Sequence, residues 1–83
     1  LEQNYPNPFN PVTNIRFSIP KDEFVEIELF DVTGRFVASV LSEPKQACIY
    51  NVDFNASGLA SGVYFYKITA GKFTDVKKMV LVK

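Results

Sequence analysis

The fold is decided by a stretch near the end of the chain that runs Ser61-Gly62-Val63-Tyr64-Phe65-Tyr66-Lys67-Ile68. Its inward-facing candidates, Tyr64, Tyr66 and Ile68, recur at every second position, and this period is typical of a β-strand. A turn at Ala70-Gly71-Lys72 follows, and residues 73–83 then alternate in the same way. The pattern predicts a β-hairpin whose last strand ends at Lys83.

Four more alternating segments precede this hairpin, and no segment shows a helical period. The expected core residues are Ile15, Phe17, Ile19, Val25, Ile27, Leu29, Val37, Tyr50, Val52, Phe54, Met79 and Leu81. The first strand is expected to begin at Asn14, and a tight turn is expected at residues 31–34. Two loops are expected, one at residues 42–46, where Pro44 lies, and one at residues 55–61. We therefore predict a small all-β, immunoglobulin-like antiparallel β-sandwich of six to seven strands. A barrel is the alternative, but few strands joined alternately by tight turns and longer crossings favour the sandwich.

The first thirteen residues have a different composition, with Pro6, Pro8 and Pro11 among polar residues. Proline fixes its own φ and favours an extended residue before it, so residues 1–13 are expected to form an extended lead-in packed on a domain of residues 14–83. Tyr5 and Phe9 are the expected anchors, within the set Tyr5, Pro6, Asn7, Pro8 and Phe9. Leu1 is expected to mark the start of a fragment.

Composition argues against several classes of function. Nine basic residues balance nine acidic ones, so no electrostatic footprint for nucleic acid is expected. The chain has no histidine, which is the commonest general base and metal ligand, so neither an enzyme nor a cofactor or metal site is expected. Cys48 is the single cysteine and forms no internal disulfide. It is interpreted as a small strand residue or an accidental surface thiol, which, if exposed, could link two copies in an oxidising medium.

Other candidate residues have an ordinary interpretation beside a functional one. Glu26 and Glu28 share one strand face, where two carboxylates suit acid–base chemistry or Ca²⁺ but more often form the solvated face of a sheet. Asp31 and Asp53 are expected to stabilise turns or strand ends.

Large apolar side chains are also expected opposite the core face, at Phe24, Phe30, Val63 and Phe65. They form either an aromatic platform for glycan or peptide, or a second covered face; a bulge that shifts the register is a further explanation. Lys77, Lys78 and Lys83 give the last strand a basic end, which blocks random strand addition and is compatible with recognition by one receptor.

Four motifs in order give the chain a resemblance to a known family. They are Gln3-Asn4-Tyr5-Pro6-Asn7-Pro8-Phe9-Asn10-Pro11, Leu29-Phe30-Asp31-Val32-Thr33-Gly34-Arg35, Gly58-Leu59-Ala60-Ser61-Gly62-Val63-Tyr64 and Lys77-Lys78-Met79-Val80-Leu81-Val82-Lys83. Together they resemble the type A C-terminal sorting domain of type IX secretion in Bacteroidetes-like bacteria. The chain departs from the family at Cys48, where glycine is usual, and at Phe54, where tryptophan is typical.

The resemblance implies a seven-stranded sandwich that directs a larger cargo protein through the periplasm to an outer-membrane translocon. Delivery would be to the cell surface or the medium, commonly with removal by a surface sortase. The implied translocon-recognition residues are Gly62, Tyr64, Lys77, Lys78, Met79, Val80, Leu81, Val82 and Lys83. A homodimer through the terminal strand or Cys48 is a further expectation.

Two other functions stay open at this point. The segment Ser61-Gly62-Val63-Tyr64 is similar to one in the immunoglobulin-like domain of flagellar hook-capping proteins, a structural module that needs neither the lead-in nor the lysine-bearing end. A carbohydrate-binding accessory domain would use exposed aromatics such as Phe65, but the chain has no tryptophan.

Overall fold

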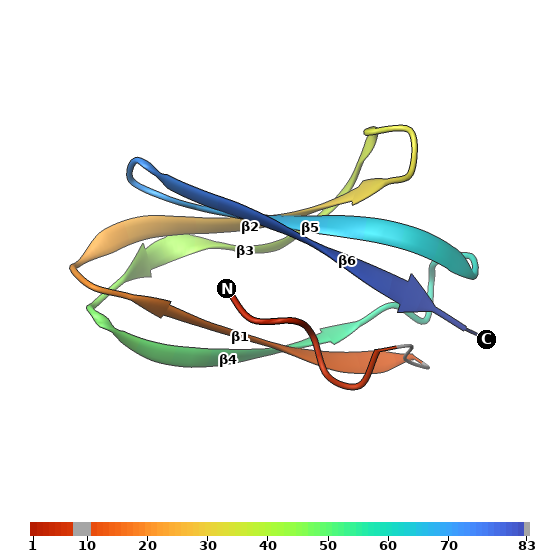
Figure 1. Cartoon of the computed structure of the whole chain (residues 1–83), viewed down its shortest axis with the longest axis horizontal. Helices are drawn as coiled ribbons and strands as arrows, with labels where there is room; N and C mark the ends of the chain where they lie inside the picture. The colour runs from red at the N-terminus through yellow and green to blue at the C-terminus, as the bar shows by residue number, and fades with distance from the viewer. Residues whose placement is uncertain (8–10, 83) are drawn as a thin grey trace.

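The strands form two antiparallel layers in the computed structural model, which describes residues 1–7 and 11–82 (Figure 1). The strands are β1 (Val12–Ile19), β2 (Glu23–Asp31), β3 (Phe36–Lys45), β4 (Cys48–Asn55), β5 (Gly62–Ala70) and β6 (Phe73–Leu81). One sheet has the order β3-β2-β5-β6, and the other consists of β1 and β4. The predicted all-β antiparallel sandwich is confirmed. Among the described residues there are six strands and one isolated bridge, between Tyr5 and Asn14.

Alternate side chains of four strands fill the space between the two sheets. Every expected core residue of β1, β2, β5 and β6 is buried: Ile15, Phe17, Ile19, Val25, Ile27, Leu29, Tyr64, Tyr66, Ile68, Met79 and Leu81. A period of two places all of these residues on one face of each strand, so burying one face fixes the register of the strand. The core therefore depends on long-range packing between the sheets rather than on local structure.

The core predictions for β3 and β4 hold only in part. Val37 on β3 and Tyr50, Val52 and Phe54 on β4 are half-buried and pack against the margin of the core. Both strands lie at the edge of their sheets. Strand β1 starts at Val12, two residues before the predicted start.

The loop predicted at residues 42–46 is wrong. Strand β3 continues to Lys45, and Pro44 lies within it, opposite Phe24 of β2. Proline lacks the N–H that a central strand needs, but an edge strand such as β3 leaves one side unpaired. The pairing of β2 with β3 also shifts twice, between Ile27 and Glu28 and between Leu29 and Phe30, as at a β-bulge.

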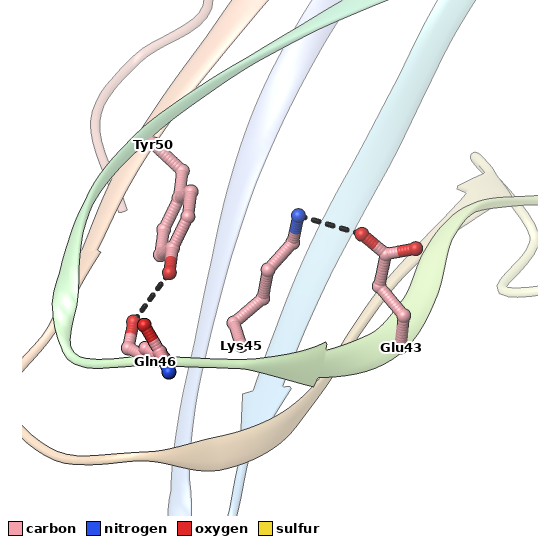
Figure 2. A network of polar contacts seen from close by, with 4 residues as sticks. All are labelled: Glu43, Lys45, Gln46 and Tyr50. Atoms are coloured by element: carbon pink, nitrogen blue, oxygen red, sulfur yellow. Dashed lines mark hydrogen bonds and ion pairs between the residues drawn. The ribbon is translucent and has the colours of Figure 1, made fainter.

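A small polar cluster fastens the corner where the chain crosses from β3 to β4 (Figure 2). The Tyr50 hydroxyl donates to the carbonyl oxygen of Gln46, and the Lys45 ammonium lies 4.9 Å from the centre of the Tyr50 ring. Lys45 also pairs with Glu43 at 2.6 Å, and this hydrogen bond raises the pKa of Lys45. The Tyr50 ring stacks on Phe17 of β1, so the corner is tied to the core.

Candidate functional site

The predicted recognition residues lie on the hairpin formed by β5 and β6. Its two-residue turn is Gly71-Lys72, between the paired residues Ala70 and Phe73. Gly71 has a φ of 61°, and a glycine with positive φ at the first central position is typical of a type II′ turn. Gly62 begins β5 with a φ of 156°, a value that residues with side chains rarely adopt. Lys83 lies outside the described residues.

Three of the predicted recognition residues belong to the core. Tyr64 lies opposite Met79 in the hairpin, and Met79 and Leu81 are almost completely buried. The Tyr64 hydroxyl donates to the Ala60 carbonyl oxygen at 2.6 Å. These side chains hold the hairpin against the rest of the sandwich, so a partner cannot touch them while the domain is folded.

The other residues of β6, together with Val82 just after its end, give this part of the chain its accessible surface. Lys78 and Val82 are exposed, and Lys77 and Val80 are half-buried. On the outer face of the sheet, Lys78 lies opposite Phe65 and Val80 opposite Val63. A partner of the folded domain therefore meets a cation beside apolar groups at the end of the last strand.

The lead-in contacts the sandwich mainly through its backbone and its amide side chains. The backbone N–H of Tyr5 donates to the Asn14 carbonyl oxygen at 3.0 Å, and the N–H of Asn14 donates back at 2.9 Å. The Tyr5 side chain is 81% exposed, so the prediction that its ring anchors the lead-in is wrong. The Pro6 carbonyl oxygen accepts bonds from the side chains of Asn4 and Thr13. The other predicted aromatic anchor, Phe9, lies outside the described residues together with Pro8.

Sequence reasoning missed a buried hydrogen-bond centre at Tyr66. Its hydroxyl accepts from the N–H of Asn4 at 2.7 Å and donates to the carbonyl oxygen of Glu2 at 2.9 Å. Asn4 is itself buried, and its side chain also donates to the hydroxyl of Thr13 at 2.9 Å. Burial raises the pKa of Tyr66 to about 12, so the hydroxyl keeps its proton at neutral pH.

Two amide side chains of the lead-in reach β6. The Gln3 amide donates to the Lys78 carbonyl oxygen at 2.6 Å. The Asn7 side-chain oxygen accepts the backbone N–H of Val80 at 2.8 Å. The start of the chain therefore lies alongside the terminal strand, and Figure 1 shows the lead-in passing between β1 and β6.

Three of the four acidic candidates have a structural partner or an opposite cation, and Glu26 lies opposite Thr69 of β5. Glu28 lies directly opposite Lys67 of β5, and Asp53 accepts a bond from the Asn14 side chain at 2.9 Å. Asp31 Oδ1 accepts from the hydroxyl and N–H of Thr33 and from the N–H of Arg35, and these bonds, that of the Thr33 hydroxyl first, lower the pKa of Asp31. No group of three potential metal ligands occurs in the part of the chain that the structure describes.

Cys48 and the outer aromatic residues lie on the surface. Cys48 is exposed, beside a hollow of about 760 Å³ that Leu1 and Phe73 also line. Phe30 lies between Phe36 and Phe65 on the outer face of the four-stranded sheet, and its ring meets that of Phe36 edge-on with the centroids 6.1 Å apart. These rings therefore face outward rather than toward a second covered layer.

Comparison with known families decides between the functions that the sequence left open. A model described as the secretion system C-terminal sorting domain matches residues 3–83. The chain belongs to this family of sorting domains. The match includes both the lead-in and the terminal strand, the two segments that a hook-capping module would not need. No curated protein and no solved structure matches the chain.

Membership of the sorting-domain family identifies the chain as a type IX secretion C-terminal sorting signal. It implies a cargo protein that passes through this secretion system to the cell surface or the extracellular space. Within the described ranges, the sorting domain has no helix long and apolar enough to cross a membrane.

Proposed function

We propose that the folded domain is recognised by the outer-membrane translocon of type IX secretion through the exposed side of β6. One observation carries the proposal: Met79 and Leu81 fix the terminal strand in the core, while Lys78, Val80 and Val82 face outward or lie half-exposed. A partner therefore meets a rigid strand with one orientation, which lowers the entropy that is lost on binding.

The remaining steps of the proposal follow the family. The cargo and its sorting domain cross the periplasm, the translocon binds the hairpin of β5 and β6, and a surface sortase then removes the domain. The domain itself acts as a sorting signal and performs no catalysis. Gly62 and Tyr64 act indirectly in this scheme, because they position β5 and through it β6.

A fusion experiment tests this proposal. Residues 1–83 are attached to a fluorescent protein that bears a signal peptide, in a host with type IX secretion, with and without its translocon. Charge reversal of the terminal strand, Lys77→Glu with Lys78→Glu, should retain the cargo in the periplasm. Deleting residues 79–83 is a poorer test, because it removes two core residues and confuses unfolding with lost recognition.

The matched control reverses two exposed cations that lie outside the hairpin of β5 and β6, Lys21→Glu with Arg35→Glu. Circular dichroism of each purified domain establishes that it is folded. Delivery of the wild type that does not depend on the translocon would contradict the function. If both charge-reversed fusions are delivered equally well, the role of β6 in recognition is contradicted, but the sorting function is not.

A further inference from the structure

Strand β6 is an edge strand with one side turned away from β5. Ala70 and Phe73 flank a two-residue turn and so form a hydrogen-bonded pair, after which bonded and non-bonded pairs alternate along the hairpin. Residues 74, 76, 78 and 80 consequently point their backbone N–H and C=O groups away from β5. Such a row of groups is a template for another strand.

Side chains cap this free edge at three successive outward positions. Asp75 accepts the N–H of Val76 at 2.9 Å, Gln3 donates to the carbonyl oxygen of Lys78, and Asn7 accepts the N–H of Val80. Two of the three caps come from the lead-in. An amide side chain forms a hydrogen bond with a backbone group of the edge strand but presents no row of backbone donors and acceptors. A capped edge therefore does not extend the sheet by a further strand.

The lead-in is held in place by bonds that a second strand would have to displace. The N–H of Glu2 donates to Arg16 of β1 at 2.8 Å, and Tyr5 forms its bridge with Asn14 on the same strand. Tyr66 holds the backbone between these two points. The lead-in therefore lies along β1 with its amide side chains directed to β6.

From this geometry we propose that the lead-in masks a strand-acceptor edge, and that β6 of two copies pair edge to edge when the lead-in is released. Antiparallel pairing centred on Val76 places Thr74 of one copy opposite Lys78 of the other. In such a pair the N–H of Thr74 requires the Lys78 carbonyl oxygen, which is the atom that Gln3 occupies. A carbonyl oxygen can accept two bonds, but the Gln3 side chain lies on the side of β6 that the second strand would have to occupy, so masking and pairing compete.

Charge favours a second copy as the occupant. The same register places Asp75 of each copy opposite Lys77 of the other, which gives two opposite-charge pairs across the interface. The chain has zero formal net charge, so no long-range repulsion separates two copies. Val76 is 52% exposed and would pack against its own counterpart.

The test removes the two caps of the lead-in from the 83-residue chain, by Gln3→Ala with Asn7→Ala. Both side chains belong to exposed residues and lie outside the apolar core. Gln3→Ala also removes the bond from Gln3 to the side-chain oxygen of the buried Asn4, so circular dichroism must first show that the variant is folded. Hydrogen exchange at the Val80 amide should become roughly tenfold faster, because a hydrogen bond to it is lost. Sedimentation velocity should show a dimer dissociation constant roughly tenfold lower than that of the wild type, since a competitor for the edge is gone.

Two further variants make the result specific. Gln46→Ala with Asn51→Ala removes the same two side-chain types from exposed residues away from β6, and should leave exchange and association unchanged. Adding Val76→Pro to the uncapped variant should restore the monomer, because the Val76 N–H points away from β5 and proline is tolerated there. Reductant is present throughout, since Cys48 is exposed.

Unchanged exchange at Val80 in the uncapped variant would overturn the masking. Faster exchange with unchanged association would overturn the pairing between copies. Association that persists after Val76→Pro would place the contact elsewhere on the molecule and would equally overturn the pairing.

Discussion

Removing one hydroxyl group, by Tyr66→Phe, tests whether the lead-in contributes to the stability of the folded domain. The substitution keeps the ring in the core and deletes the bonds to the Asn4 N–H and the Glu2 carbonyl oxygen. Asn4 is only 2% exposed, so its N–H is left without its hydroxyl partner in a site that water hardly reaches.

The expected cost follows from the asymmetry of hydrogen-bond energetics. Removing both partners of a hydrogen bond changes the free energy of unfolding little, but removing one partner and leaving a buried donor unpaired lowers it by about 1–3 kcal/mol. We therefore expect the free energy of unfolding to fall by about 2 kcal/mol. For a domain of this size the melting temperature should fall by roughly 8–16 °C.

Urea and thermal denaturation of the 83-residue chain measure the effect. Tyr64→Phe is the matched control, because the Tyr64 hydroxyl donates to a single carbonyl oxygen, that of Ala60, and leaves no lone donor. It should cost about 1 kcal/mol or less. The reasoning is refuted if Tyr66→Phe unfolds within about 0.3 kcal/mol of the wild type, a difference too small for a stranded buried donor.

The same hydroxyl predicts a response to alkaline pH. Its pKa is raised by burial from 10.0 to about 12, so the folded state holds the proton more tightly than the unfolded state does. The stability that this preference contributes is complete below pH 10.0 and is lost as the pH rises toward about 12. Tyr66→Phe lacks this contribution, so its stability should fall less steeply than that of the wild type over this range.

Two further predictions concern β6 and the turn after β2. Met79→Ala should lower the free energy of unfolding by about 2–5 kcal/mol, because it opens a cavity in the core. Val82→Ala, at a half-exposed position, should change the free energy of unfolding by about 0.5 kcal/mol or less. Equal effects of the two substitutions in urea denaturation would contradict the placement of Met79 in the core. Asp31→Ala removes the acceptor for Thr33 and Arg35 and should lower the melting temperature; a melting temperature equal to that of the wild type would contradict the role of the turn. In the wild type this stabilisation should be lost as the pH falls through the lowered pKa of Asp31, and a series of melting curves at acidic pH would detect the loss.

The alternation of side chains was sufficient to predict the strands that are buried on one face. Ile15, Phe17 and Ile19 illustrate this, because only one register places all three in the core. The method failed at β3, where Pro44 suggested a loop. Whether a strand tolerates proline depends on whether it lies at the edge of its sheet, and this is a property of the assembled fold rather than of residues 42–46.

The lead-in shows a second limit of local reasoning. Aromatic side chains in a polar segment suggested an anchor at Tyr5, yet the ring is exposed and the amides of Gln3, Asn4 and Asn7 make the contacts. Polar contacts of this kind leave no periodic pattern in the sequence, because each side chain bonds to one particular backbone group or hydroxyl elsewhere in the fold. Tyr66 was predicted as a core residue, but nothing near it in sequence indicates where its hydroxyl would find partners.

The contacts of the lead-in also impose an order in time. Asn4 and Tyr66 are 62 residues apart, and Gln3 and Lys78 are 75 apart. Within the domain, residues 1–7 are therefore synthesised well before the residues that they contact. A chain that stops short of Lys78 keeps residues 1–7 loose and extended, which is the form that proteases cut most readily. Docking of the lead-in therefore requires that synthesis has passed Val80.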